Sequence, residues 1–143
     1  MKGFVLIIGF ILSFSVLGQK NELSCSGLPD VLFKKGEFDL DHLDMVYLDT
    51  VVVFSNENQD VIFVISGHTD SLGYLKYNLK LSRKRVKSVA KYLSKKGINK
   101  RKLKLFWFGE TKLRFECPKD IECSEEIHQF NRRVEIRLIF PKL

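Results

Sequence analysis

The sequence lacks acidic residues over the whole stretch from Ser71 to Gly109, where lysine and arginine accumulate. The chain as a whole carries a formal net charge of +7. A field of one sign favours an anionic polymer or an anionic membrane surface as a partner. A solvated face that only keeps the protein soluble has the same composition, so both interpretations stay open.

The sequence also lacks an apolar run long enough to cross a membrane. Lys2 precedes the apolar run from Phe4 to Leu17, which is shorter than the ~20 residues that a spanning helix needs. This pattern predicts a secretory signal at residues 1–18, with cleavage after Gly18, although an uncleaved inner-membrane anchor is the alternative. Export argues against a nucleic-acid partner, because an exported protein seldom meets DNA or RNA.

Internal repeats are absent, and 143 residues suffice for one domain with a single core. We expect a short N-terminal linker at residues 19–27 and one domain at residues 28–143. Six segments carry a periodic pattern. They predict strands at residues 30–33, 61–66, 103–108 and 134–140, a helix with apolar positions from 40 to 54, and a helix at residues 75–96.

Local signals place the ends of these elements. Asp39 or Asp41 can cap the first helix, and Gly97 can end the second. Residues 111–130 form the one long segment expected to be irregular. Strands alternating with helices favour an α/β sandwich, with a small mixed sheet and helices packed on one face.

The chain has three cysteines. Cys117 and Cys123 lie close together in the irregular segment, which is typical of a small disulfide in an oxidising compartment. A metal site that uses both thiols and His128 is the rival, although the spacing fits no zinc pattern, and we expect no metal. Cys25 then has no partner within the chain. It is either a lipidation site, although Lys20 and Glu22 precede it where a lipidation motif would be apolar, or a free or intermolecular thiol.

Opposite charges flank the junction between the strand at 61–66 and the helix at 75–96. Asp70 lies in the connecting loop, and Arg85 lies on the flank of the helix, from where its side chain leans back toward the loop. Arginine binds a carboxylate through paired hydrogen bonds, and an aspartate can meet an ammonium. The junction therefore suits a ligand such as an amino acid, which carries both groups.

The residues of this junction belong to a longer pattern. It comprises Gly67-His68-Thr69-Asp70, Gly73, Asn78, Leu81-Ser82, Arg85, Tyr92-Leu93, Gly97-Ile98, Gly109-Glu110 and Asn131-Arg132-Arg133-Val134-Glu135-Ile136. From about Leu28 to Phe140 the chain resembles the family of OmpA-like peptidoglycan-binding domains. The resemblance implies the family's βαβαββ sandwich. It also allows a disulfide in the loop of Cys117 and Cys123, as some members have.

The resemblance also implies a function. Members bind peptidoglycan non-covalently by gripping the diaminopimelate of the stem peptide, without an enzymatic activity and without a cofactor. Asp70 would take the ammonium and Arg85 the carboxylate, Asn78 would shape the pocket, and Arg132 would lie nearby. Such a domain would tether or organise the outer membrane and the wall, from the periplasm or the outer membrane. The alternative is an accessory subunit of an envelope complex with weak or no wall binding.

Several of these residues also have ordinary structural explanations. His68 is expected to be a hydrogen-bonding loop residue rather than a base, and Arg132 or Arg133 could be a surface charge beside a strand. Ser66, His68 and Asp70 alternate along an extended segment, so they cannot converge as a hydrolytic relay. Val86 stands where the family usually has alanine, which is expected to affect the pocket's geometry rather than the fold.

Overall fold

The computed structural model describes residues 22–25, 28–117 and 121–141. The elements are β1 (Glu22–Cys25), β2 (Val31–Leu32), α1 (His42–Glu57), β3 (Ile62–His68), α2 (Leu75–Lys95), the 3₁₀ helix η1 (Lys100–Lys102), β4 (Leu103–Gly109), α3 (Glu125–Asn131) and β5 (Arg133–Pro141). The expected signal peptide, its cleavage point and most of the expected linker lie outside the described residues, as does the side chain of Cys25.

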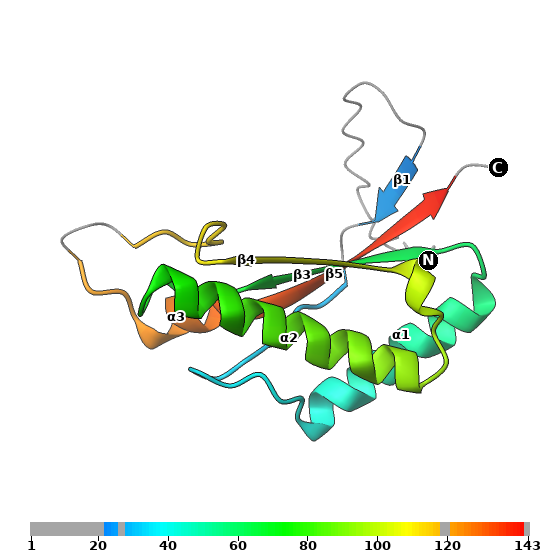
Figure 1. The fold of residues 1–143 in the computed structure, drawn as a ribbon, viewed down its shortest axis with the longest axis horizontal. Coiled ribbons are helices and arrows are strands. Elements are labelled where there is room, and N and C mark those ends of the chain that lie inside the picture. Colours follow the sequence, from blue (N-terminus) through cyan, green and yellow to red (C-terminus); the bar gives the residue numbers. More distant parts are fainter. Residues whose placement is uncertain (1–21, 26–27, 118–120, 142–143) are drawn as a thin grey trace, which may run out of the picture.

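The strands form one mixed sheet in the order β1-β5-β3-β4. β5 is central: it pairs antiparallel with β3 on one side, and with β1 and β2 on the other. β3 and β4 are parallel, and α2 makes the crossover between them. β4 is an edge strand of this sheet, and Figure 1 shows α2 running along the sheet beside it.

Helix α1 begins where the sequence places a good cap. The Asp41 carboxylate accepts a hydrogen bond from the Asp44 backbone N–H (2.8 Å), and the Asp44 carboxylate accepts one from the Asp41 N–H (3.0 Å). This reciprocal pair satisfies two backbone donors that the helix itself leaves free. Of the two expected caps, Asp41 is therefore the one used.

Helix α2 ends through a glycine in the left-handed region. Gly97 has φ 106°, its N–H donates to Ser94, and the N–H of Ile98 donates to the Leu93 carbonyl. These two bonds satisfy carbonyls that the last turn leaves free, and glycine adopts this φ without the strain that a Cβ would add. The expected stop at Gly97 is confirmed.

The core lies between the sheet and helices α1 and α2. Val86, Val89 and Leu93 of α2 pack with Phe63 and Ile65 of β3, and further buried members come from α1, β2, β4, β5 and the loops between the elements. α1 lies beside the C-terminal half of α2 (Figure 1), where the Tyr92 hydroxyl donates to the Asp49 carboxylate. The expected mixed sheet with helices on one face is confirmed.

Besides the single turn η1, two elements were not predicted from the sequence. The segment at 111–130, expected to be irregular throughout, contains the start of α3, which the side chain of Ser124 caps. β1 pairs with the C-terminal half of β5. Both are short, and neither has the periodic pattern that longer elements show. Among the described residues, none of the helices has the length and the apolar composition of a membrane span.

Candidate functional site

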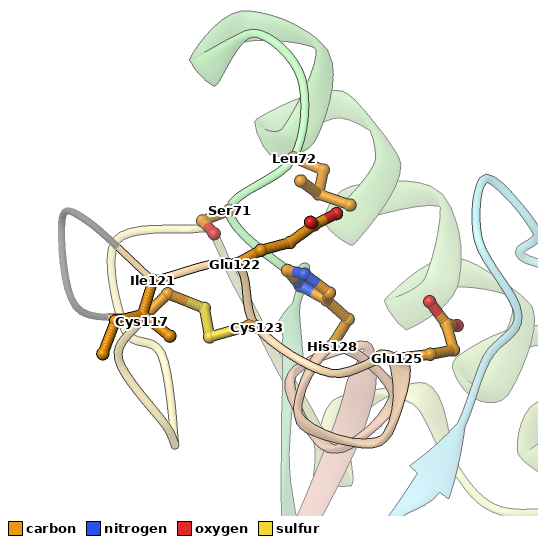
Figure 2. A pocket seen from close by; sticks show the side chains of 8 residues that line it. All are labelled: Ser71, Leu72, Cys117, Ile121, Glu122, Cys123, Glu125 and His128. Carbon is orange, nitrogen blue, oxygen red and sulfur yellow. A yellow bond between two sulfur atoms is a disulfide. The ribbon is translucent and has the colours of Figure 1, made fainter.

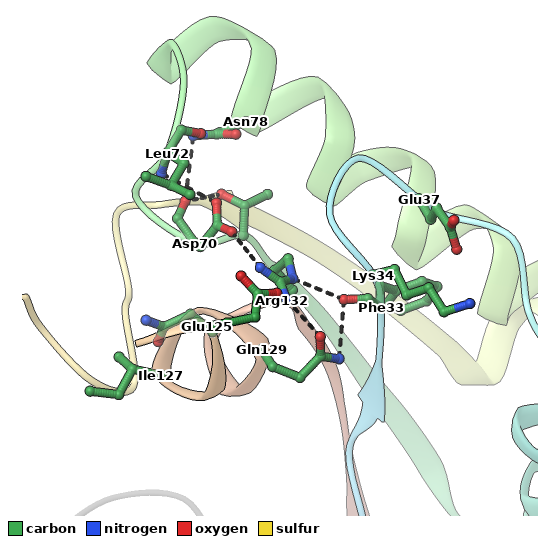
Figure 3. Close-up of polar contacts among 12 residues, drawn as sticks. Phe33, Lys34, Glu37, Asp70, Leu72, Asn78, Glu125, Ile127, Gln129 and Arg132 are labelled. Carbon is green, nitrogen blue, oxygen red and sulfur yellow. Dashed lines mark hydrogen bonds and ion pairs between the residues drawn. The ribbon is translucent and has the colours of Figure 1, made fainter. Parts of the chain in front are cut away.

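The four predicted site residues come together at one end of the sheet. Asp70 follows β3, Asn78 and Arg85 lie in α2, and Arg132 precedes β5. All four are buried and line one pocket of about 360 Å³. Figure 3 shows Arg132 pointing toward Asp70, with Asn78 above them on the helix.

Close approach of α2 to the sheet builds this end of the molecule. A Cβ on Gly67 would lie 2.5 Å from both the Ser82 carbonyl oxygen and a methyl of Val86. The Ser82 hydroxyl accepts a hydrogen bond from the Gly109 N–H (2.9 Å) and so ties the end of β4 to the same helix. Gly67 and Ser82 thus set the distance at which Arg85 enters the pocket.

Arg85 is anchored by the backbone rather than by an acid. Its Nε donates to the Glu37 carbonyl (2.8 Å), and its terminal nitrogens donate to the carbonyls of His68 (3.0 Å) and Lys34 (3.2 Å). Three of the five guanidinium N–H groups are thereby used, and two remain for a ligand. Burial lowers the pKa of Arg85 to about 10, opposed by the Asp70 charge, so the group stays cationic at neutral pH.

Asp70 and Arg132 form a buried ion pair. Arg132 Nη1 donates to Asp70 Oδ2 at 3.0 Å, and the other carboxylate oxygen accepts from the Leu72 N–H at 3.2 Å. The bond to Leu72 is the local turn contact that aspartate favours in loops. Each carboxylate oxygen has a second acceptor direction, so the pair can still receive a donor from a ligand.

Arg132 is held from three further sides. Its Nε donates to the Phe33 carbonyl (3.1 Å), and Nη2 donates to the side chains of Gln129 (2.6 Å) and Glu125 (Figure 3). Sequence reasoning missed Glu125 and Gln129, because they belong to the unpredicted helix α3. Their spacing from Arg132, seven and three residues along a helix, is the signal that would have found them.

Asn78 closes the pocket beside Gly73. Its amide nitrogen donates to the Leu72 carbonyl (3.0 Å) and to the Glu110 carboxylate. Gly73 has φ 97°, a conformation that side chains rarely adopt, and it lets the loop after Asp70 turn into α2. These bonds hold Asn78 against the loop after Asp70, and its contact with Glu110 has no signature in the sequence.

The lining of the pocket carries more positive than negative charge. Besides Asp70, Arg85 and Arg132, the lining includes Lys35. Three cations and one carboxylate line the space, and Glu125 pairs with Arg132 from outside it. Such a site can hold a ligand that has carboxylates together with a smaller number of ammonium groups.

A second pocket, of about 500 Å³, adjoins the first at Leu72. Figure 2 shows its lining, with the Cys117–Cys123 disulfide on one side and Glu122, Glu125 and His128 on the other. The disulfide expected from the sequence is confirmed. The disulfide uses both thiols of the rival metal site, and within the described part of the chain no group of three or more His, Cys, Asp or Glu could hold a metal ion.

His68 and Arg133 lie away from the pocket of Asp70 and Arg85, on the other face of the sheet. His68 Nδ1 contacts the Lys112 carbonyl (3.1 Å), and Arg133 pairs with Glu135 (2.7 Å). Burial and the nearby Arg133 charge lower the pKa of His68 to about 4. His68 is thus a neutral, hydrogen-bonding residue, and of the two neighbouring arginines only Arg132 reaches the pocket.

Much of the sequence is similar to known proteins. The model of the OmpA family matches residues 32–125. A 73-residue segment is 44% identical to the photosystem I P700 chlorophyll a apoprotein A2 of Gloeobacter violaceus, covering 50% of this chain and 8% of that protein. The peptidoglycan-associated lipoprotein of Pseudomonas putida is 36% identical over 74 residues, 52% of this chain and 42% of that protein. The chain thus matches less than half the length of these relatives.

A solved structure has the same fold. The peptidoglycan-associated lipoprotein of Burkholderia pseudomallei superposes with a TM-score of 0.67 at 23% identity, covering 76% of this chain and 88% of that chain. The family model spans well over half of the sequence, from β2 to the start of α3, and includes Asp70, Asn78 and Arg85. The chain therefore belongs to the OmpA family.

Proposed function

We propose that this chain binds peptidoglycan non-covalently in the cell envelope, and that its pocket grips the diaminopimelate of the stem peptide. Membership of the OmpA family supports the general function, because domains of this family bind peptidoglycan and are not enzymes. The similarity to a peptidoglycan-associated lipoprotein supports it further. The resemblance to the family implies the specific ligand, and the charges of the pocket support it.

The observation that carries the proposal is the placement of Asp70, Arg85 and Arg132 in one buried pocket. Diaminopimelate in a stem peptide differs from a neutral side chain by a carboxylate and, where it is not cross-linked, an ammonium. The free N–H groups of Arg85 suit the carboxylate, and the Asp70 oxygens suit the ammonium. Arg132 holds Asp70 in place through their 3.0 Å bond.

Localisation belongs to the same proposal. The chain acts in the periplasm or at the outer membrane, after export directed by residues 1–18, and connects the wall with the envelope. Retention at the outer membrane would follow if Cys25 carried a lipid, which mass measurement of the mature N-terminus would reveal. A soluble periplasmic form predicts the unmodified mass.

Co-sedimentation with purified sacculi tests the proposal. We would use the mature chain from Gln19, with sacculi that contain diaminopimelate and sacculi that contain lysine at the same position. Lysine has the ammonium but lacks the side-chain carboxylate, so the pair isolates the group assigned to Arg85. We expect binding to the diaminopimelate wall and at least about tenfold weaker binding to the lysine wall, the loss of one charge-assisted pair.

Matched variants test whether the pocket is the part of the chain that binds the wall. Asp70→Asn keeps the shape of the side chain and removes its charge, and Asp60→Asn makes the same charge change at an exposed position. We expect only the first to lose wall binding. Arg85→Lys keeps the cation but cannot reproduce the three carbonyl bonds, so circular dichroism must accompany it. A folded wild type that stays in the supernatant would contradict the proposal and favour the accessory-subunit alternative.

A further inference from the structure

A separate groove of about 540 Å³ lies between α2 and the edge strand β4. Its rim carries four lysines: Lys87, Lys91 and Lys95 from α2 and Lys100 from η1. Its floor is apolar and consists of Ala90, Leu103 and Leu105. It shares no lining residue with the pocket of Asp70 and Arg85.

The positive charge of the groove is not neutralised by the protein. α2, η1 and β4 contain no acidic residue, and none of the four lysines takes part in an ion pair within the described residues. By contrast Lys96, on the flank that faces α1, pairs with Asp49 at 3.0 Å. The charge is thus left free on the β4 side of the helix.

The exposed ring of Trp107 continues the apolar floor along β4. Trp107 lies two residues beyond Leu105, so alternation along the strand places both on the same face of the sheet. Trp107 is 37% exposed, and the Arg83 guanidinium lies 5.1 Å from the centre of its ring. The neighbouring Phe106 is 48% exposed, and the same alternation places it on the opposite face of the sheet, beside Phe108.

We propose that this groove and the adjoining edge of β4 dock on a membrane surface that carries anionic phospholipids. The lysine ammoniums would meet the lipid phosphates, while the apolar floor and Trp107 would meet the boundary between headgroups and acyl chains. A soluble anionic polymer would satisfy the lysines alone and would leave the exposed ring of Trp107 uncovered. Tryptophan is suited to such a boundary because one end of its ring system is apolar and the other donates a hydrogen bond.

The groove and the pocket of Asp70 and Arg85 are built on the same helix, α2. Asn78 and Arg85 lie in the N-terminal and middle turns of α2, whereas the groove follows its C-terminal half. One rigid helix would therefore carry two binding sites, each made of different side chains. Membrane docking does not depend on the wall-binding proposal, and either one can fail alone.

Vesicle co-sedimentation tests the inference. The probes are vesicles of phosphatidylcholine with and without phosphatidylglycerol, and the protein is the chain from Gln19. We expect binding only to the anionic vesicles, weakening with added salt. Lys87→Glu/Lys91→Glu should reduce this binding by about tenfold or more, since each lysine close to an anionic surface contributes several-fold in affinity.

The control variant is Lys112→Glu/Arg137→Glu. Both residues are exposed. Arg137 pairs in register with Val64, and the Lys112 ammonium lies over the ring of Phe108, which stacks on His68, so the net charge changes by the same amount on the opposite face of the sheet, away from the groove. We expect the control to bind like the wild type. If the two variants lose binding equally, or if the wild type does not bind anionic vesicles, the inference is wrong.

Trp107 supplies a second readout because it is the only tryptophan in the chain. Docking through β4 should shift its fluorescence to the blue and allow quenching by brominated lipids. Soluble polyphosphate serves as the competing anion. If polyphosphate binds through the same lysines while vesicles leave the Trp107 fluorescence unchanged, the groove binds a soluble anion and membrane docking is refuted.

Discussion

Arg132 donates to Asp70 across 3.0 Å, and both side chains are almost wholly buried. The two residues are 62 positions apart in sequence, so the pair joins the start of the loop after β3 to the start of β5. An ion pair in such a place is a weak source of net stability, because both charges lose their water. Its value lies in fixing the carboxylate that the proposed ligand meets.

Removing one partner of this pair should destabilise the fold. Asp70→Ala leaves the Arg132 charge buried with Glu125 and Gln129 as its remaining side-chain partners. We expect a loss of about 3 kcal/mol in the free energy of unfolding, the lower end of the range for breaking a buried pair. Urea denaturation measures it. Asp70→Ala/Arg132→Met, which removes both charges, should recover part of that loss; a double variant no more stable than the single one would contradict this explanation.

Gly67 should not tolerate a side chain. Gly67→Ala places a methyl group 2.5 Å from the Ser82 carbonyl oxygen and from Val86 Cγ2, so the helix must move away from the sheet. We expect a loss of about 1–3 kcal/mol, typical of an overpacked core, together with weaker wall binding. Val86→Ala in the same chain removes only one of the two clashes, so it should rescue stability in part. Full rescue would show that the backbone contact with Ser82 is not limiting.

Stability should fall at mildly acidic pH because of His68. Its pKa is lowered from 6.5 to about 4, so between these values the unfolded chain binds a proton that the folded chain does not. The free energy of unfolding is therefore expected to be constant above about pH 6.5 and to decrease by about 2–3 kcal/mol toward pH 4.5. Urea titrations at several pH values check this. His68→Gln, which does not titrate, should flatten that part of the profile.

The disulfide should stabilise the loop before α3 by a modest amount. Cys117 and Cys123 are six residues apart, and closing so short a loop is worth about 2 kcal/mol in the chain-entropy model. Cys117→Ser/Cys123→Ser should lower the midpoint of thermal unfolding accordingly. Neither cysteine lines the pocket of Asp70 and Arg85, so we expect the variant to bind sacculi like the wild type. Loss of binding without unfolding would assign the loop a direct part in recognition.

Much of the fold could be predicted from the sequence because its long elements have strong periodic patterns. α1 begins at Asp41 and α2 ends at Gly97, and both signals are local in sequence. β1 and α3 were missed for the opposite reason. Each is short, and each is held by partners far away in the chain, such as β5 for β1. Local reasoning has no access to such partners.

The residues of the site could be predicted from the sequence, but the hydrogen bonds that hold them could not. The pattern of the family placed Asp70, Asn78, Arg85 and Arg132 together, and the structure brings all four into one pocket. What the sequence could not reveal is that Arg85 is held by three backbone carbonyls, two of them from residues 34 and 37. A carbonyl has no sequence signature, because every residue carries one. Whether these side chains bind as proposed stays a prediction.

The central place of β5 has a consequence for how this domain forms. β5 follows every other described element in the chain, yet β1, β2 and β3 all pair with it. The sheet cannot close, and Arg132 cannot meet Asp70, before residues 133–141 have found their place. Contacts of such long sequence separation slow folding relative to helical domains of similar size. The last strand is therefore the step that turns a pair of helices and loose strands into a domain able to bind.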